Sequence, residues 1–116
     1  MNGKILINSR NGCWVCSEVS YANTWLTRMI GLLSRHTLYD GEGLWLSPCH
    51  SIHTIGMKFP IDVIFLDKHN YVRKVVEQLK PYRICISCKG SFSVLELPVG
   101  IISKTLLQKG DRLSVL

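Results

Sequence analysis

Two C-x-x-C pairs are the clearest chemical feature of this sequence. Cys13 with Cys16 and Cys85 with Cys88 account for four of its five cysteines. Two such pairs can supply the four thiolates of a tetrahedral zinc site. However, 68 residues separate the pairs, far more than the roughly 15 to 20 residues of common zinc motifs. A structural zinc site is therefore one interpretation, and small, partly buried apolar side chains are the other.

A second group of reactive side chains consists of Cys49, His50 and His53. One thiol and two imidazoles within five residues could ligate a metal ion such as zinc, or form a thiolate nucleophile with a histidine base. Asp62 could orient a histidine if the chain folds back onto this segment. The alternative is that Cys49 packs in the core while His53 donates to a backbone carbonyl. This segment carries the hypothesis of a small metal- or thiol-dependent enzyme.

Positive charge is concentrated in one part of the chain, whose net charge is +6. Between positions 68 and 89, a single carboxylate, Glu77, stands against six cations: Lys68, Arg73, Lys74, Lys80, Arg83 and Lys89. Such a cluster favours anionic partners such as phosphate, nucleic acid or a membrane surface. The alternative is an ordinary solvated surface. No RNA-binding motif, helix-turn-helix pattern or common catalytic motif accompanies it.

These observations favour a non-enzymatic binding module over an enzyme, although they identify no ligand. The partner would be an anionic ligand or an anionic protein. The candidate binding residues are Arg28, Arg35, Lys74, Arg83 and Lys89. Arg28 and Arg35 lie seven residues apart, on roughly one face of a predicted helix, where each could instead pair with an acid. An Arg28–Asp62 ion pair would satisfy both charges and is the structural alternative to ligand binding.

Length and composition indicate one domain spanning residues 1–116. The apolar content of 47% and charged content of 19% are those of a folded chain. No apolar run approaches the roughly 18 residues of a membrane span, and the first residues lack the pattern of a secretory signal. We therefore expect a soluble, cytoplasmic protein with reduced thiols.

The predicted elements are one helix followed mainly by strands. Trp25, Met29 and Leu33 have helical spacing, and the glycines at 41 and 43 end the helix. Ile61–Leu66, which follows Pro60, predicts a central strand that is buried on both faces, Phe65 included. This strand should pair with residues 71–79 through a turn at 67–70. Other strands are expected at 4–8, 13–21, 44–46, 91–97 and 112–116, with a short helical turn at 101–107. The predicted fold is α+β and mainly β, a small closed or nearly closed antiparallel barrel of about seven short strands with one N-terminal amphipathic helix.

Several segments, in order and spacing, resemble one family. They are RMIGLLSR at 28–35, IHT at 52–54, FPIDVIFLD at 59–67, VLELP at 94–98 and GD at 110–111. The set resembles domain of unknown function 192, an uncharacterised bacterial and archaeal family. The resemblance implies a β-rich single domain with a helix near its start, and it supplies no catalytic residues. Many members carry an export signal or membrane anchor, and a Trp-Met-Lys-Asn-Thr stretch where this chain has residues 53–57.

Overall fold

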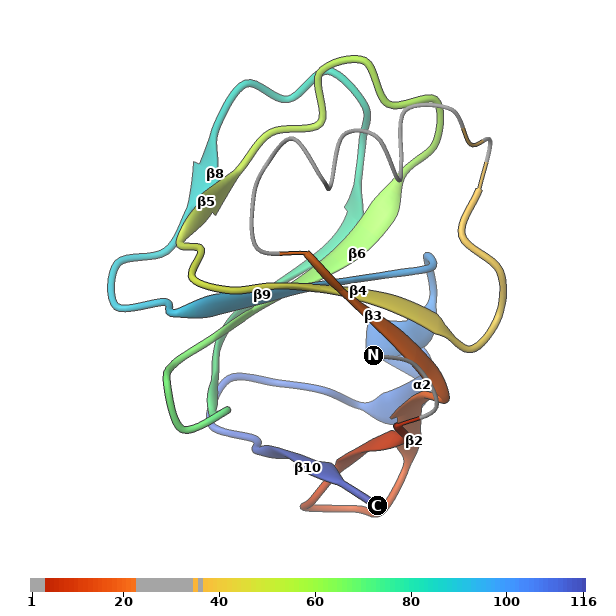
Figure 1. Ribbon diagram of the computed structural model, residues 1–116, viewed down its shortest axis with the longest axis vertical. Helices are drawn as coiled ribbons and strands as arrows, with labels where there is room; N and C mark the ends of the chain where they lie inside the picture. Colours follow the sequence, from red (N-terminus) through yellow and green to blue (C-terminus); the bar gives the residue numbers. More distant parts are fainter. Residues whose placement is uncertain (1–3, 23–34, 36) are drawn as a thin grey trace.

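The computed structural model describes residues 4–22, 35 and 37–116, which form a mainly β structure (Figure 1). A five-stranded sheet has the order β3-β4-β9-β6-β7. Its strands are β3 (Glu18–Ala22), β4 (Glu42–Leu46), β9 (Ser93–Leu97), β6 (Ile61–Leu66) and β7 (Val72–Leu79). A three-stranded sheet contains β10 (Leu113–Val115), β1 (Leu6–Asn8) and β2 (Trp14–Cys16), and a two-stranded sheet pairs β5 (Ser51–Ile52) with β8 (Ile86–Ser87).

Strand β6 is the centre of the structure. It is antiparallel to β9 on one side and to β7 on the other, and all six of its residues are buried. This confirms the predicted hairpin and the burial of Phe65, which is 0% exposed. Because successive side chains of a strand point to opposite faces, β6 contributes to two separate hydrophobic clusters.

One face of the sheet packs against the three-stranded sheet and α2 (Ile101–Thr105). Ile64 and Leu66 of β6 lie in this first cluster. Its other members include Leu6, Val15, Leu113 and Ile102, so β1, β2, β10 and α2 all contribute to the cover. In Figure 1 these elements lie below the five-stranded sheet.

Among the described residues, irregular chain and the β5–β8 pair cover the opposite face, and Figure 1 shows them above the sheet. Ile61, Val63 and Phe65 of β6 lie in this second cluster. The covering side chains include Leu38, Ile52, Met57 and Phe59, with Ile86 of β8 packed against them. The segment from residue 49 to residue 59 is thus held on this face by its apolar members.

The predicted closed barrel is wrong, because the strands divide among three sheets that do not close on one another. The β-strand is interrupted at Ser17, where the N–H groups of Ser17 and Glu18 both donate to the carbonyl of Gly41, each at 2.9 Å. The predicted strand at 13–21 is therefore two strands, β2 and β3, in different sheets. In addition, β3 pairs with β4 in parallel, so the main sheet is not purely antiparallel.

The other elements can be compared with their predictions individually. The hairpin of β1 and β2, the strands at 93–97 and 113–115 and a helical turn at 101–105 are present. The predicted helix containing Trp25, Met29 and Leu33 lies outside the described residues. Within the described part of the chain, no helix has the length and hydropathy that a bilayer crossing requires.

Candidate anion-binding site

Two neighbouring cations of β7 reach the same segment of chain, which consists of the end of β8 and the residues that follow it. Arg73 donates from Nε to the carbonyl oxygen of Lys89 at 3.2 Å, and Lys74 donates from Nζ to that of Ser87 at 3.2 Å. In a regular strand, consecutive side chains would point to opposite faces. The register between β6 and β7 shifts at Phe65 and Leu66, and such an irregularity re-aims side chains.

The close approach of Arg73 depends on Gly90. A Cβ atom at Gly90 would lie 2.9 Å from the Arg73 Cζ atom, and Gly90 has a φ of +85°. Glycine adopts this left-handed conformation without steric cost. The sequence indicated a turn at Gly90, but the contact with Arg73 could not be predicted, because it depends on a side chain 17 residues earlier in the chain.

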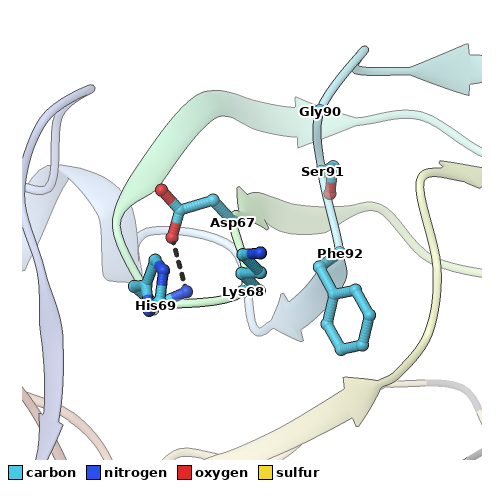
Figure 2. Close-up of a pocket in the computed structure, with 6 residues that line it drawn as sticks. All are labelled: Asp67, Lys68, His69, Gly90, Ser91 and Phe92. Atoms are coloured by element: carbon cyan, nitrogen blue, oxygen red, sulfur yellow. Dashed lines mark hydrogen bonds between the residues drawn. The ribbon is translucent and has the colours of Figure 1, made fainter.

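Beside these cations lies an open depression of about 270 Å³. Figure 2 shows Lys68 and His69 on the β6–β7 turn on one side, and Gly90, Ser91 and Phe92 on the other. Lys68, His69 and Phe92 are all exposed. The depression therefore combines two side chains that can donate to an anion with one aromatic ring. The Ser91 hydroxyl donates instead to backbone carbonyls, including that of Ser93 at 3.0 Å.

A carboxylate, Asp67, also borders the depression, but backbone donors engage it. It accepts the N–H groups of His69 at 2.8 Å and Tyr71 at 3.0 Å. Burial acts to raise the pKa of Asp67, yet these two donors, together with the charges of His69 and Arg73, outweigh it and hold that pKa below its usual range. Asp67 thus stays ionised while it shapes the turn that presents Lys68 and His69.

We call Lys68, Arg73, Lys74 and Lys89 the basic surface. All four side chains are exposed. Of the other predicted binding residues, Arg83 lies in the β7–β8 loop, apart from these contacts, and Arg28 lies outside the described residues. Arg35 makes a two-pronged ion pair with Glu42, at 2.9 and 2.6 Å, and this bond lowers the pKa of Glu42. The charge of Arg35 is therefore already balanced.

Strand β5 positions the Cys49–His53 segment on the face of the five-stranded sheet that carries the second hydrophobic cluster. The Cys49 thiol donates to the carbonyl of Ser51 at 3.2 Å, and His53 Nδ1 accepts the N–H of Ile55 at 3.3 Å. His50 is exposed. Pairing of β5 with β8 brings Cys85 to this segment, with 3.3 Å between its Sγ and the Oγ of Ser51.

Asp62 lies on the other face of the sheet from Cys49 and His53. It is 0% exposed and accepts the N–H groups of Gln78 at 2.9 Å, Gly100 at 3.1 Å and Ile102 at 3.0 Å. The last two belong to the beginning of α2, on the first-cluster face. The three residues considered for catalysis are therefore not brought together. A second fully buried carboxylate, Glu96, did not emerge from the sequence analysis.

The two C-x-x-C pairs are also far apart. Cys16 belongs to β2 and Cys13 precedes it, whereas Cys85 and Cys88 flank β8. Figure 1 shows these strands on opposite sides of the five-stranded sheet. Among the described residues, no three His, Cys, Asp or Glu side chains are grouped to hold a metal ion. Burial raises the pKa of Cys16 to about 11, which disfavours the thiolate that a metal needs. These residues do not fit the zinc site considered above.

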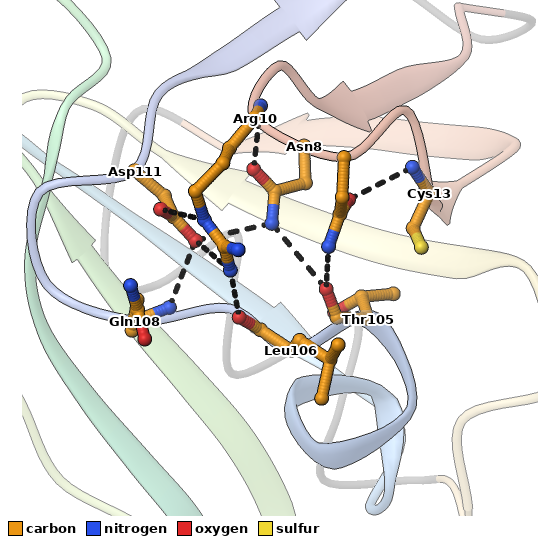
Figure 3. A network of polar contacts seen from close by, with 8 residues as sticks. Asn8, Arg10, Cys13, Thr105, Leu106, Gln108 and Asp111 are labelled. Carbon is orange, nitrogen blue, oxygen red and sulfur yellow. Dashed lines mark hydrogen bonds and ion pairs between the residues drawn. The ribbon is translucent and has the colours of Figure 1, made fainter.

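A polar network lies away from the depression, where the β1–β2 turn meets the segment after α2 (Figure 3). Arg10 donates from Nε to Asp111 at 2.7 Å and from Nη2 to the carbonyl of Leu106 at 2.7 Å. Asn8, which is fully buried, donates to Asp111 at 3.1 Å. Among the described residues, no buried side-chain nitrogen or oxygen lacks a hydrogen-bond partner, so this network is structural rather than ligand-binding.

Comparison with known proteins places the chain in an uncharacterised family. Residues 6–115 match the model of DUF192, described as "Uncharacterized ACR", and the chain belongs to that family. UPF0127 protein PF1050 of Pyrococcus furiosus is 30% identical over 113 residues, covering 93% of this chain and 95% of the relative. A UPF0127 protein of Thermococcus sibiricus is 30% identical over 116 residues, covering 94% of this chain and 73% of the relative.

Two solved structures share the fold. A protein of Sinorhizobium meliloti, described as a candidate transcription regulator, has a TM-score of 0.81 at 22% identity, covering 97% of this chain and 91% of that one. A protein of unknown function from Novosphingobium aromaticivorans has a TM-score of 0.76 at 20% identity, covering 96% and 82%. Neither the family nor these structures identifies an activity.

Proposed function

We propose that this protein is a non-enzymatic binding module, and that the basic surface and its depression hold an anionic partner. The observation that carries this proposal is that Arg73 and Lys74 both reach the segment that carries Lys89, beside Lys68 and His69. Clustered cations raise the local positive potential and attract polyanions. The partner is recognised mainly by charge, with Phe92 as a neighbouring apolar contact.

Three features support binding rather than catalysis. The thiol of Cys49 donates to the carbonyl of Ser51 and Nδ1 of His53 accepts the N–H of Ile55, so both groups already bind the local backbone. Asp62 is occupied by three backbone donors on the other face of the sheet. The basic surface, in contrast, offers exposed donors whose carbonyl contacts leave further N–H groups for a ligand.

Retention on immobilised heparin, eluted with a salt gradient, tests this proposal. The parent protein should bind and elute at a defined salt concentration, because counterion release makes polyanion binding salt-dependent. The variant K68E/K89E should elute at clearly lower salt. Both side chains are exposed, so both substitutions should leave the fold intact.

The matched control is K4E/K104E, which changes the net charge equally at two exposed lysines outside the basic surface. This control should lose much less retention than K68E/K89E. Equal losses in the two variants would mean that net charge alone causes retention, and a parent protein that flows through the column would end the proposal.

A further inference from the structure

Two loops are joined into a single tip, which we define as residues 53–60 and 80–85. The N–H of Thr54 donates to the carbonyl of Arg83, and the N–H of Tyr82 donates to the carbonyl of Thr54, both at 2.9 Å. The Thr54 hydroxyl donates to the carbonyl of Lys80 at 2.7 Å and accepts the N–H of Arg83 at 2.9 Å. Thr54, which is fully buried, therefore fixes one loop against the other.

This loop tip exposes three large apolar side chains next to the buried Thr54. Ile84 is 79% exposed, Tyr82 is 69% exposed and Ile55 is 45% exposed. Tyr82 also has a φ of +65°, a conformation that is costly for a residue with a bulky side chain. Exposed apolar side chains grouped on ordered backbone are typical of an interaction site.

The charges of the loop tip are all positive. Lys58, Lys80 and Arg83 are exposed, and the two segments contain no aspartate or glutamate. The neighbouring acids along the chain are Asp62, which is fully buried, and Glu77, which lies within β7. A partner of the tip must therefore combine an apolar region with negative charge.

We propose that the loop tip inserts into the headgroup region of an anionic lipid bilayer. Isoleucine and tyrosine side chains would enter the interface while lysine and arginine meet the lipid phosphates. This inference goes beyond the proposed function, because the loop tip follows the end of β7 whereas Arg73 and Lys74 of the basic surface lie at its beginning. A nucleic acid offers little apolar surface to two isoleucines. A standard protein interface needs about 800 Å² on each side, more than three projecting side chains supply.

The test is flotation with large vesicles of phosphatidylcholine, prepared with and without phosphatidylglycerol. The parent protein should bind only the vesicles that contain phosphatidylglycerol. Ile84→Ser should weaken this binding at least fivefold, because burying one such side chain is worth a tenfold or larger change in affinity. Val115→Ser is the matched control, since Val115 is 57% exposed at the end of β10, and it should bind as the parent does.

Heparin retention of the same variants separates this inference from the proposed function. Ile84→Ser should elute from heparin with the parent, because it changes no charge. If the parent binds heparin but no vesicles, the partner is a soluble polyanion or an acidic protein, and the inference fails while the proposed function stands. If Ile84→Ser and Ile55→Ser both bind vesicles as the parent does, the loop tip does not insert. If the parent protein binds neither heparin nor vesicles, both proposals are overturned.

Discussion

Asp62 shows at the level of a single residue how the fold uses a buried charge. Its two carboxylate oxygens hold the N–H groups of Gln78, Gly100 and Ile102, which join β7 and the beginning of α2 to β6. Gln78 has a φ of +52°, so this bond also stabilises an unfavourable backbone conformation. The residue therefore acts as a structural connector between three elements.

Asp62→Ala should destabilise the protein by roughly 2 to 4 kcal/mol, because the buried N–H of Ile102 would lose its acceptor at a cost of about 1 to 3 kcal/mol, and the part-buried N–H groups of Gln78 and Gly100 would add less. Urea unfolding followed by circular dichroism measures this loss. The control is Asp40→Ala, at an exposed aspartate, which should change stability by no more than about 0.5 kcal/mol. If the two variants unfold at the same urea concentration, the role given to Asp62 is incorrect.

The sequence predicted part of this role. A carboxylate within an apolar strand needs a partner, and the sequence suggested Arg28 for Asp62. Arg28 lies outside the described residues. Backbone donors cannot be read from side-chain types, because they depend on where the chain after β9 meets β6. The same limitation applied to Gly90, whose role depends on the position of Arg73.

The cysteines should differ widely in reactivity toward a thiol-alkylating reagent at neutral pH. Burial raises the pKa of Cys16 to about 11, so its thiolate fraction at neutral pH is roughly 100-fold or more below that of an ordinary cysteine. Cys85 is exposed and should react first, and Cys16 should react last. Peptide mapping after timed alkylation measures the order. Fastest reaction at Cys49 would instead revive the hypothesis of a thiol enzyme.

Among the elements, β6 contributes most to the core because neighbours cover both of its faces. Phe65→Ala should cost roughly 3 to 5 kcal/mol of the free energy of unfolding, as expected for a fully buried phenylalanine. Phe92→Ala is the control, since Phe92 is 48% exposed and should cost clearly less. Chemical denaturation of both variants gives the comparison, and equal losses would mean that the core is centred elsewhere.

Sequence patterns predicted the elements better than their pairing. The apolar run of β6 indicated burial on both faces, and Pro60 and the 67–70 turn marked the hairpin. Alternation of side chains cannot distinguish which strand lies beside another. The break at Ser17 and the parallel pairing of β3 with β4 follow from contacts with residues 41–46, which no local pattern in 13–21 reveals.

The contact between the β1–β2 turn and the segment after α2 should make the free energy of unfolding depend on pH. The hydrogen bond from Arg10 lowers the pKa of Asp111 in the folded protein, whereas an unfolded aspartate titrates near 3.9. The folded state therefore binds this proton less readily. The stabilisation is complete above about pH 5 and is lost as the pH falls through the folded pKa.

Asp111→Asn removes this charge and gives the test. The difference in melting temperature between the parent and Asp111→Asn should be large at pH 7 and should shrink toward pH 3. Thermal unfolding across this range measures it. A difference that stays constant with pH would show that the charge of Asp111 does not stabilise the fold.

For the whole molecule, the topology determines how the cations of residues 68–89 are distributed. The sequence predicted their density, and it predicted an anionic partner from it. It could not show that Arg73 and Lys74 reach the segment that carries Lys89. Nor could it show that Lys80 and Arg83 belong to the loop tip instead. That division depends on the β5–β8 pairing and on Thr54, which bring residues about 30 positions apart into contact.

The most direct test of the central claim is a ¹⁵N NMR titration of the full chain with a heparin oligosaccharide. The proposed function predicts the largest chemical-shift changes at the amides of residues 68–74 and 87–92, with little change in β1, β2 and α2. These changes should diminish as salt is added. Shifts centred on the Cys49–His53 segment or on α2, or no shifts at low salt, would contradict the account.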